Sequence, residues 1–353
     1  MIFLSIIAFA LVLGLLIFVH ELGHFLAAKK AGIKVEEFGM GFPPKLFGIK
    51  RGETVYSINV IPLGGFTKLM GEEDPAEPRS FASKKPLTRL WVLAAGPLMN
   101  AILPVVLLSI AFMIPRDIAV GDVTINEVAP NSPAAQAGIL PGDIIVGMGG
   151  VPIQNIGELV YNTHLNLGKS VTVEVLRADG VTEMLTLVPR WDPPEDEGPI
   201  GVALSLENAY TISKSYPIWE AIPKSGSTLA ETFSLLRNEV RSWFIRGSPP
   251  QVTGPIGIFE LTGEASQAGP SYLLQFAAFL SLNLAIINLF PLPALDGGRI
   301  VFILLEIARR GRRVSPRTEG MIHLIGFAAL ISLIVLITYF DVLRMIRGES
   351  LIP

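Results

Sequence analysis

Four long runs of apolar residues constrain the possible folds of this chain of 353 residues more than any other feature of its sequence. The runs cover residues 2–19, 90–115, 265–295 and 320–340. None of them contains a charged residue, and His323 in the fourth run is their single histidine. Because about 20 consecutive apolar residues cross the hydrocarbon core of a bilayer as a helix, each run can span a membrane. The sequence therefore predicts a multi-pass α-helical membrane protein with four transmembrane helices.

The composition agrees with a membrane protein and excludes several other classes. Hydrophobic residues make up 50% of the chain and charged residues 17%, whereas typical soluble domains have about 25% charged residues. A wholly soluble enzyme is therefore not expected. The formal net charge of −3 gives no reason to expect a nucleic-acid partner. The absence of cysteine excludes disulfides, thiolate metal ligands and cysteine nucleophiles.

The charged residues between the runs are sorted by sign. Residues 29–89 contain 11 basic and 7 acidic residues, whereas residues 116–264 contain 9 basic and 18 acidic residues. A third segment, residues 309–317, is rich in arginine. Loops rich in lysine and arginine tend to stay in the cytoplasm. We therefore expect the first loop and the arginine-rich loop to be cytoplasmic, with both termini and the long acidic segment on the other side of the membrane.

The acidic segment predicts a compact, extracytoplasmic α+β domain at residues 120–190. Ser132 is placed to cap a short helix, Pro133 to begin it and Gly138 to end it. Residues 171–188 then alternate between apolar and polar side chains on either side of a turn, as in a β-hairpin. This order of strands, helices and hairpin resembles a PDZ domain in the permuted arrangement of bacterial membrane-linked proteases.

The segments on either side of this domain define its expected role. Residues 116–122 lack the alternating glycine and apolar residues that would cradle a peptide carboxylate. We therefore expect the PDZ-like domain to exclude bulky partners sterically rather than to bind peptide C-termini. Residues 191–222 begin with an acidic, proline-rich stretch that is typical of a solvated linker. Residues 223–264 contain an amphipathic helix whose apolar stripe we expect to pack on protein, with a position on the membrane surface as the alternative.

The first apolar run leads into the sequence His20-Glu21-Leu22-Gly23-His24. Residues four apart lie on one face of a helix, so His20 and His24 can both reach one metal ion. Zinc bound by neutral nitrogen ligands lowers the pKa of its water toward about 7, and Glu21 is placed to take the proton. Ionisable groups at a membrane boundary cost about 2.5 kcal/mol or more each, so this cluster indicates a functional site rather than an ordinary helix surface.

A catalytic zinc needs a third protein ligand and an open position for water. Asp296 is the candidate, because it follows a long uncharged run at the same expected membrane level as the two histidines. Pro291 and Pro293 break the predicted third helix just before it, and a broken helix at membrane depth lines a cavity. His323 is the alternative ligand, on the same expected side of the membrane. His164 belongs to the outer domain, on the opposite side.

The motif at residues 20–24, the sequence Leu295-Asp296-Gly297 and the outer PDZ-like domain together resemble the site-2 protease family of intramembrane zinc metalloproteases. The resemblance covers nearly the whole chain and indicates the bacterial RseP-like branch. It implies that His20, His24 and Asp296 bind Zn2+ and that Glu21 is the catalytic acid and base. It also implies a location in the bacterial inner membrane, with the active site near the cytoplasmic side.

The same resemblance suggests which residues hold the substrate. Asn288 belongs to the family's substrate-holding segment, and Asn100 ends a Gly-Pro-x-x-Asn motif that approaches the site. A helix–helix hydrogen bond is the alternative role for Asn100. Residues 55–66 are similar to the family's membrane-associated β-loop, in which Gly64 and Gly65 lie near the end. An edge strand there would pair with an unwound substrate helix, because hydrolysis requires exposed backbone. A peripheral hairpin without substrate contact is the alternative.

The predicted order of segments follows from these assignments. It comprises transmembrane helix 1 with the metal motif (1–28), a membrane-associated β-loop forming a hairpin (29–88), transmembrane helix 2 (89–115), the PDZ domain (120–190), the linker (191–222), the amphipathic helix and connector (223–264), transmembrane helix 3 with the Asp-Gly motif (265–298), a basic cytoplasmic loop (299–318) and transmembrane helix 4 (319–343).

The resemblance implies an endopeptidase that hydrolyses peptide bonds in transmembrane segments of membrane-anchored substrates, in regulated intramembrane proteolysis. Single-span membrane proteins such as anti-sigma factors, or remnant signal peptides, are the implied substrates. The alternative is a non-catalytic, PDZ-bearing membrane scaffold with a structural zinc site. Structural zinc sites usually have four protein ligands, and only three good candidates are present. A transporter is a third possibility, but four spans without an inverted repeat argue against it.

Overall fold

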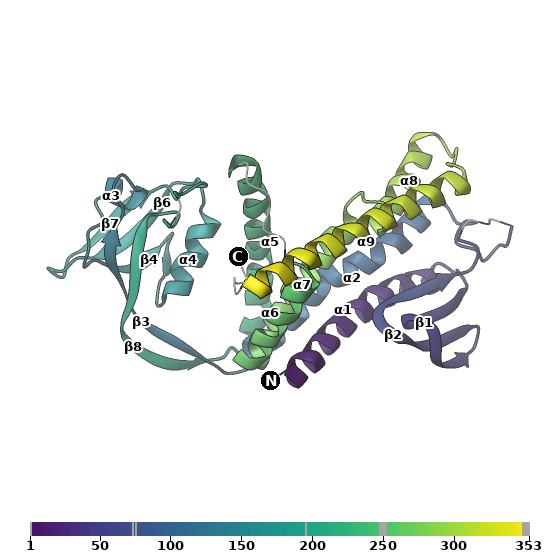
Figure 1. Ribbon diagram of the computed structural model, residues 1–353, viewed down its shortest axis with the longest axis horizontal. Coiled ribbons are helices and arrows are strands. Elements are labelled where there is room, and N and C mark those ends of the chain that lie inside the picture. Colours follow the sequence, from purple (N-terminus) through teal and green to yellow (C-terminus); the bar gives the residue numbers. More distant parts are fainter. Residues whose placement is uncertain (1, 73, 75, 195, 247–252, 348–353) are drawn as a thin grey trace. The chain divides into compact units, whose positions relative to one another are not determined.

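The computed structural model describes residues 2–72, 74, 76–194, 196–246 and 253–347. The chain divides into two compact units (Figure 1). We call residues 1–111 together with 252–353 the helical unit, and residues 112–251 the sheet unit. All residues that the sequence assigns to metal binding and catalysis belong to the helical unit, so each unit can be described by itself.

Within the described residues, four helices are long and apolar enough to cross a membrane, which agrees with the predicted number. They are α1 (Ile2–Lys30), α2 (Pro86–Met113), α7 (Pro270–Leu289) and α9 (Pro316–Arg347). Large apolar side chains cover their surfaces; on α1, for example, Phe3 and Leu11 are 76% and 68% exposed. Such surfaces suit contact with lipid, because a helix satisfies its own backbone hydrogen bonds. In α9, none of the most apolar stretch is buried against the protein.

The third apolar run is broken before its end, as Pro291 and Pro293 predict. Helix α7 ends at Leu289, and α8 (Asp296–Ala308) begins after a short non-helical segment that contains Pro291 and Pro293. The prediction that residues 299–318 form a loop is wrong for residues 299–308, which belong to α8. The arginine cluster suggested a loop, but it begins only at Arg309, after an apolar helical stretch.

A helix that the sequence did not predict, α6 (Pro255–Ala268), packs along α1. The rings of Phe9 and Phe259 meet edge to face with their centroids 5.6 Å apart. Gly263 lies so close to Ser5 that a Cβ atom would overlap the serine side chain. Small residues allow helices to approach in this way inside a membrane. The predicted connector ends at residue 264 and the predicted third transmembrane helix begins at residue 265, so α6 corrects both predictions where they meet.

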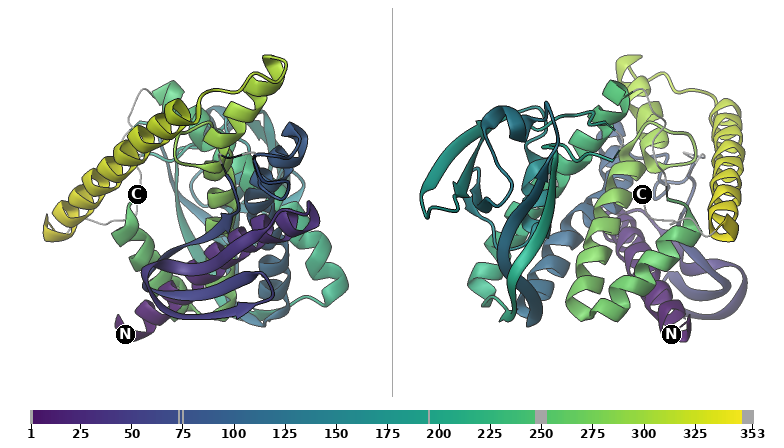
Figure 2. Two further views of the ribbon diagram at one scale, coloured as in Figure 1. Left: turned by 90° about the vertical axis from the view of Figure 1, so that its right-hand side faces the viewer. Right: turned by 60° about the vertical axis from the view of Figure 1, so that its left-hand side comes forward.

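The predicted hairpin is present. Strands β1 (Val35–Arg51) and β2 (Thr54–Leu69) are antiparallel and pack against α1 (Figure 2). The first half of β1 pairs on both sides, so that Gly39 is opposite both Ser57 and Phe66. The last residues of β2 therefore form an edge of this small sheet. The hairpin is longer than the predicted strand at residues 55–60, because glycines and prolines in β1 conceal its strand pattern.

The sheet unit is built on an antiparallel sheet with the strand order β7-β6-β4-β3-β8. Its strands are β3 (Arg116–Val128), β4 (Ile144–Met148), β6 (Val171–Leu176), β7 (Thr182–Leu187) and β8 (Val202–Lys214), with the short β5 (Val151–Pro152) paired to β4. Its helices are α3 (Pro133–Ala137), α4 (Ile156–Leu165) and α5 (Ile218–Arg246). The apolar core lies between the sheet and helices α3 and α4 and includes Val123, Ile125, Ile145, Val173 and Val175.

Helix α3 has the predicted ends. The Ala135 amide donates to the Ser132 hydroxyl oxygen at 3.1 Å, and Gly138 takes a left-handed conformation after the last turn. The prediction that residues 191–222 form a linker is wrong, because β8 lies within them and pairs with β3 along its length. The proline-rich start of this segment concealed the alternation of partly buried Val202 and Leu204 with their neighbours.

The predicted amphipathic helix corresponds to α5, but its orientation differs from the expectation. Asn238 donates to the main-chain oxygen of His164 at 3.0 Å, and the Tyr161 hydroxyl of α4 donates to Glu231 at 2.9 Å. Polar side chains therefore hold α5 on α4. Phe233 and Phe244 of the apolar stripe are 55% and 84% exposed, so the expected packing of that stripe on protein is wrong at these positions.

Candidate metal centre

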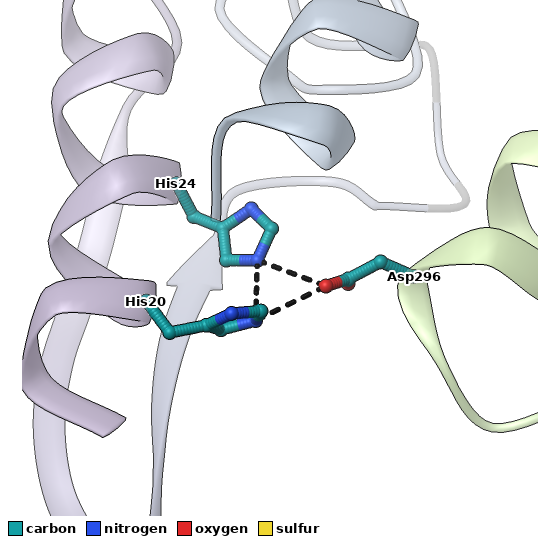
Figure 3. A group of neighbouring side chains, drawn as sticks. All are labelled: His20, His24 and Asp296. Atoms are coloured by element: carbon teal, nitrogen blue, oxygen red, sulfur yellow. Dashed lines mark hydrogen bonds and ion pairs between the residues drawn. The ribbon is translucent and has the colours of Figure 1, made fainter. Parts of the chain in front are cut away.

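Three side chains that the sequence assigned to a metal lie together in the helical unit (Figure 3). Asp296 Oδ2 is 3.1 Å from His20 Nε2 and 3.3 Å from His24 Nε2. The two histidine Nε2 atoms are 3.2 Å apart. One ligand atom from each residue thus faces a common point. Among the described residues, no other group of three or more histidine or acidic side chains is close enough together to hold one metal ion.

The geometry fits a zinc ion. Zinc binds histidine nitrogen and carboxylate oxygen at about 2.0–2.1 Å, and tetrahedral coordination then separates neighbouring ligands by about 3.3–3.4 Å. The three measured separations are close to this value. The described residues provide three ligands rather than the four of a closed structural site. This arrangement leaves one coordination position for water or substrate, as catalytic zinc sites require.

The three side chains reach this point from two different elements. His20 and His24 are one turn apart on α1, whereas Asp296 is the first residue of α8. The two residues after Asp296 are glycines for a steric reason. A Cβ atom at Gly297 would overlap the carbonyl groups of Leu289 and Phe290, and one at Gly298 would overlap that of Leu292. The chain can therefore fold back after α7 and present Asp296 only with glycine at these positions.

His24 is oriented by α2. Its Nδ1 lies 2.8 Å from the main-chain oxygen of Val92, which can only accept a hydrogen bond. The ring proton therefore belongs on Nδ1, and Nε2 keeps its lone pair for a metal. Close contact between α1 and α2 makes this possible. A Cβ atom at Gly96 would overlap the His24 ring, and one at Gly23 would overlap the Ala95 carbonyl.

Asn100, which the sequence assigned to substrate binding, lies behind His20. Its side-chain Nδ2 is 3.5 Å from His20 Nδ1, and the residue is 1% exposed. Its Oδ1 has no hydrogen-bond partner among the described residues. If His20 binds a metal through Nε2, its Nδ1 carries the proton and needs an acceptor. Turning the Asn100 amide by half a turn exchanges its Nδ2 and Oδ1 atoms, which are assigned from the hydrogen-bond network. Oδ1 then faces His20 Nδ1 and is the acceptor for its proton.

The side chain of Glu21, on α1, lies against the end of β2. The Thr67 hydroxyl is 2.8 Å from Glu21 Oε2 and 3.1 Å from the main-chain oxygen of Glu21. Gly65 packs on the same turn of α1, where a Cβ atom would come within 3.0 Å of Glu21 Cγ. Thr67 was not among the predicted site residues. No local motif marks it, because the contact joins residues 46 positions apart.

The remaining candidates lie in three places. Gly64 precedes Gly65 in β2 and has a positive φ of 97°. Asn288 is half-buried in the last turn of α7, just before the chain leaves the helix. His323, the alternative metal ligand, is not part of the metal group; its Nδ1 accepts a hydrogen bond from the Ala294 amide at 2.9 Å.

Comparison with known proteins agrees with this geometry. The model of peptidase family M50 matches residues 8–333. A relative from Clostridium acetobutylicum, which carries a provisional zinc-metalloprotease name, is 37% identical over 96% of this chain and 98% of its own. The zinc metalloprotease RasP of Geobacillus kaustophilus is 30% identical over 96% and 97%, and the regulator of sigma-W protease RasP of Bacillus subtilis is 29% identical over 97% and 99%.

The match to the family includes α2 and α7 in full, most of α1, part of α9 and every residue of the metal group. The fold contributes four helices suited to a membrane, and the relatives have zinc-metalloprotease names. A non-catalytic scaffold is therefore not the function of this chain. The protein belongs to peptidase family M50, in the RseP-like branch of the site-2 proteases, and is a membrane zinc metalloprotease with Zn2+ as its cofactor.

Proposed function

We propose that this protein hydrolyses peptide bonds within the membrane-spanning segments of membrane-anchored substrates. The observation that supports this most directly is which elements carry the three metal-binding side chains. His20 and His24 lie on a helix that can span a membrane, and Asp296 follows directly after the break in another apolar run. A substrate segment that lies between these apolar helices can reach the three side chains. A membrane-spanning segment of another protein is the partner that suits such a path.

The residues of the site have distinct roles in this proposal. His20, His24 and Asp296 hold the zinc, which when bound supplies Lewis-acid polarisation of the scissile carbonyl and lowers the pKa of water. Glu21 takes the proton from the attacking water and delivers it to the leaving amide nitrogen. The hydrogen bond from Thr67 to Oε2 orients the Glu21 carboxylate for both transfers.

The edge of β2 is the proposed substrate platform. A helical substrate hides its amides, so a segment must unwind and find new hydrogen-bond partners before hydrolysis. The end of β2 has an unpaired edge beside α1, and Gly65 brings its backbone close to Glu21. Gly64, Gly65 and Asn288 are proposed to contact the unwound substrate backbone. Because Asn100 is buried behind His20, its proposed role is to support that ligand.

The sheet unit is proposed to be a PDZ-like filter outside the membrane. A filter excludes substrates with bulky outer portions and admits those already shortened by an earlier cut. Because Arg116 and Lys214 are opposite each other in the β3–β8 ladder, residues 117–213, which form the sheet with α3 and α4, can be replaced by a short glycine linker. The proposal expects this variant to cleave full-length substrates that the intact protein rejects. Unchanged selectivity would contradict it.

The proposed orientation follows the charge pattern of the sequence. Both termini and the sheet unit face outward, and the metal centre lies near the cytoplasmic side of a bacterial inner membrane. The proposed substrates are single-span membrane proteins, such as an anti-sigma factor, or remnant signal peptides. The name of the Bacillus subtilis relative, a regulator of sigma-W protease, supports the first class.

The experiment that tests the proposed reaction is Glu21→Gln in the full-length protein, reconstituted with a single-span substrate. Zinc content should remain at one ion per chain while cleavage inside the membrane segment is abolished, because the amide has no basic oxygen to take the proton. Glu183→Gln, a change of the same chemistry at a surface ion pair with Arg177 in the sheet unit, should leave cleavage unchanged. Cleavage by the Glu21→Gln variant at the normal rate would overturn the assignment of Glu21 as the acid and base.

A further inference from the structure

Helix α9 contacts the segment that carries Asp296 at two neighbouring positions. His323 Nδ1 accepts a hydrogen bond from the Ala294 amide at 2.9 Å. Gly326, three residues later on the same face, lies against Pro293, and a Cβ atom at Gly326 would overlap the proline ring. Most of α9 is exposed, so these contacts are specific points of attachment rather than part of a continuous packed interface.

The segment that α9 contacts is strained. Ala294 has a φ of 74°, in the left-handed region that side chains other than glycine rarely adopt. Such a conformation is unfavourable for a residue with a side chain and persists only where the surroundings hold it. Ala294 lies two residues before Asp296, so its conformation sets the direction in which the chain enters α8. The hydrogen bond to His323 is formed by the amide of this strained residue.

The tautomer of His323 follows from its partner. A main-chain amide can only donate, so Nδ1 has the free lone pair and the ring proton belongs on Nε2. The ring also lies beside Phe302 of α8, with centroids 5.6 Å apart. His323 is thus held between α8 and the strained segment, and its acceptor nitrogen is used by Ala294. A single histidine in an apolar helix is costly unless such a role retains it.

We infer that His323 is a positioning residue for the third metal ligand. By accepting the Ala294 amide it holds the strained segment in the one conformation that keeps Asp296 Oδ2 beside both histidine Nε2 atoms. The inference rests on the proposed ligand set and adds a role for α9, which provides no ligand. It makes the position of Asp296 depend on the attachment of a largely exposed helix.

The test uses metal binding by the full-length protein in detergent. His323→Leu removes the acceptor, whereas His323→Asn keeps an acceptor oxygen at the place of Nδ1. Zinc affinity, measured by competition with a chromophoric chelator, should fall about tenfold in the leucine variant. The asparagine variant should recover most of that loss. The absorption spectrum of the cobalt-substituted protein should change in the leucine variant and return toward normal in the asparagine variant, because it reports ligand geometry rather than stability.

Leu324→Ala is the control for disturbing α9, because Leu324 is adjacent and 67% exposed. It should leave zinc affinity and the cobalt spectrum unchanged. A leucine variant at position 323 with normal affinity and spectrum would overturn the inference, as would an asparagine variant as weak as the leucine variant. If His323→Leu does not fold, Gly326→Ala, which displaces Pro293, takes its place, and unchanged zinc affinity there is equally contradictory.

Asp296→Asn, measured in parallel, separates this inference from the proposed ligand set. If Asp296→Asn keeps its zinc, the ligand set itself is wrong, and the role of His323 falls with it. If Asp296→Asn loses zinc while His323→Leu keeps it, the ligand set stands and only the positioning role is wrong. If both lose affinity and the asparagine variant recovers it, both conclusions are supported.

Discussion

The two halves of the metal group are built in different ways. His20 and His24 are one turn apart on α1, and helical geometry alone fixes their relative positions. Asp296 reaches the same point at the start of α8, after a non-helical segment that folds back on the end of α7. The spacing of the first two ligands is encoded by five consecutive residues, whereas the position of the third depends on contacts between distant parts of the chain.

This difference indicates where the centre is sensitive to substitution. On the α1 side, a change outside the motif can move both histidines together but hardly alters the distance between them. On the α8 side, the position of Asp296 depends on the tight contacts of Gly297 and Gly298 and on a strained backbone at Ala294. Substitutions that leave every ligand in place should therefore affect metal binding more strongly on the α8 side.

The largest expected effect comes from removing the ligand of the second half. Asp296→Asn exchanges a charged oxygen for a weaker neutral ligand at the common point of the group, so zinc should be lost on dialysis. Cleavage should fall about a thousandfold or more, on the order of 4 kcal/mol in transition-state stabilisation. Zinc content by metal analysis and cleavage in reconstituted vesicles measure the two effects. Asp179→Asn, at an exposed hairpin turn of the sheet unit, is the control with unchanged zinc content.

The comparison becomes sharper with two glycine-to-alanine changes. Gly297→Ala places a methyl group against the Leu289 and Phe290 carbonyls, so the segment before Asp296 must shift. Gly23→Ala places one against the Ala95 carbonyl and separates α1 from α2, but it keeps the spacing of the two histidines. Zinc affinity should fall about a hundredfold for Gly297→Ala and by a smaller factor for Gly23→Ala. Equal losses in chelator competition would show that the two halves do not differ.

A smaller effect is expected from the side chain behind His20. Asn100→Leu removes the acceptor that the His20 Nδ1 proton needs, so zinc affinity should fall about tenfold. Asn100→Asp, which has an acceptor oxygen whichever way the side chain is turned, should lose less. The measurement is again chelator competition. Normal affinity in the leucine variant would mean that α1 alone is sufficient to orient His20.

The same contrast explains what the sequence could predict. The two histidines and Glu21 form a local motif, so their proximity follows from helix geometry. Asp296 was predicted from its context, as a lone carboxylate after a long uncharged run. The hydrogen bonds of His24 to Val92 and of Thr67 to Glu21 were not predicted, because residues 68 and 46 positions apart meet only in the folded chain.

The fold was predictable to a similar degree. Apolar length alone identified the four candidate membrane helices, since a bilayer imposes a minimum length on such segments. Strand β8 and helix α6 were missed for opposite reasons. A proline-rich stretch ahead of β8 suggests a linker, and the mixed composition of α6 gives no clear pattern. Long-range contacts stabilise both elements, because β8 pairs with β3 and α6 packs on α1. The role of His323 was likewise invisible, because its partner is a backbone amide.

The smallest expected effect on cleavage comes from a change beside Glu21, on the α1 side of the centre. Thr67→Val removes a hydroxyl but keeps the shape of the side chain, so Glu21 loses one hydrogen bond while the metal ligands are unaffected. One such bond contributes about 1 kcal/mol, and cleavage should therefore slow about fivefold at unchanged zinc affinity. Thr67→Ser should retain most of the rate because it restores the hydroxyl. If Thr67→Val weakened zinc binding instead, β2 would support the metal ligands themselves, in addition to the α2 residues that contact the two histidine rings.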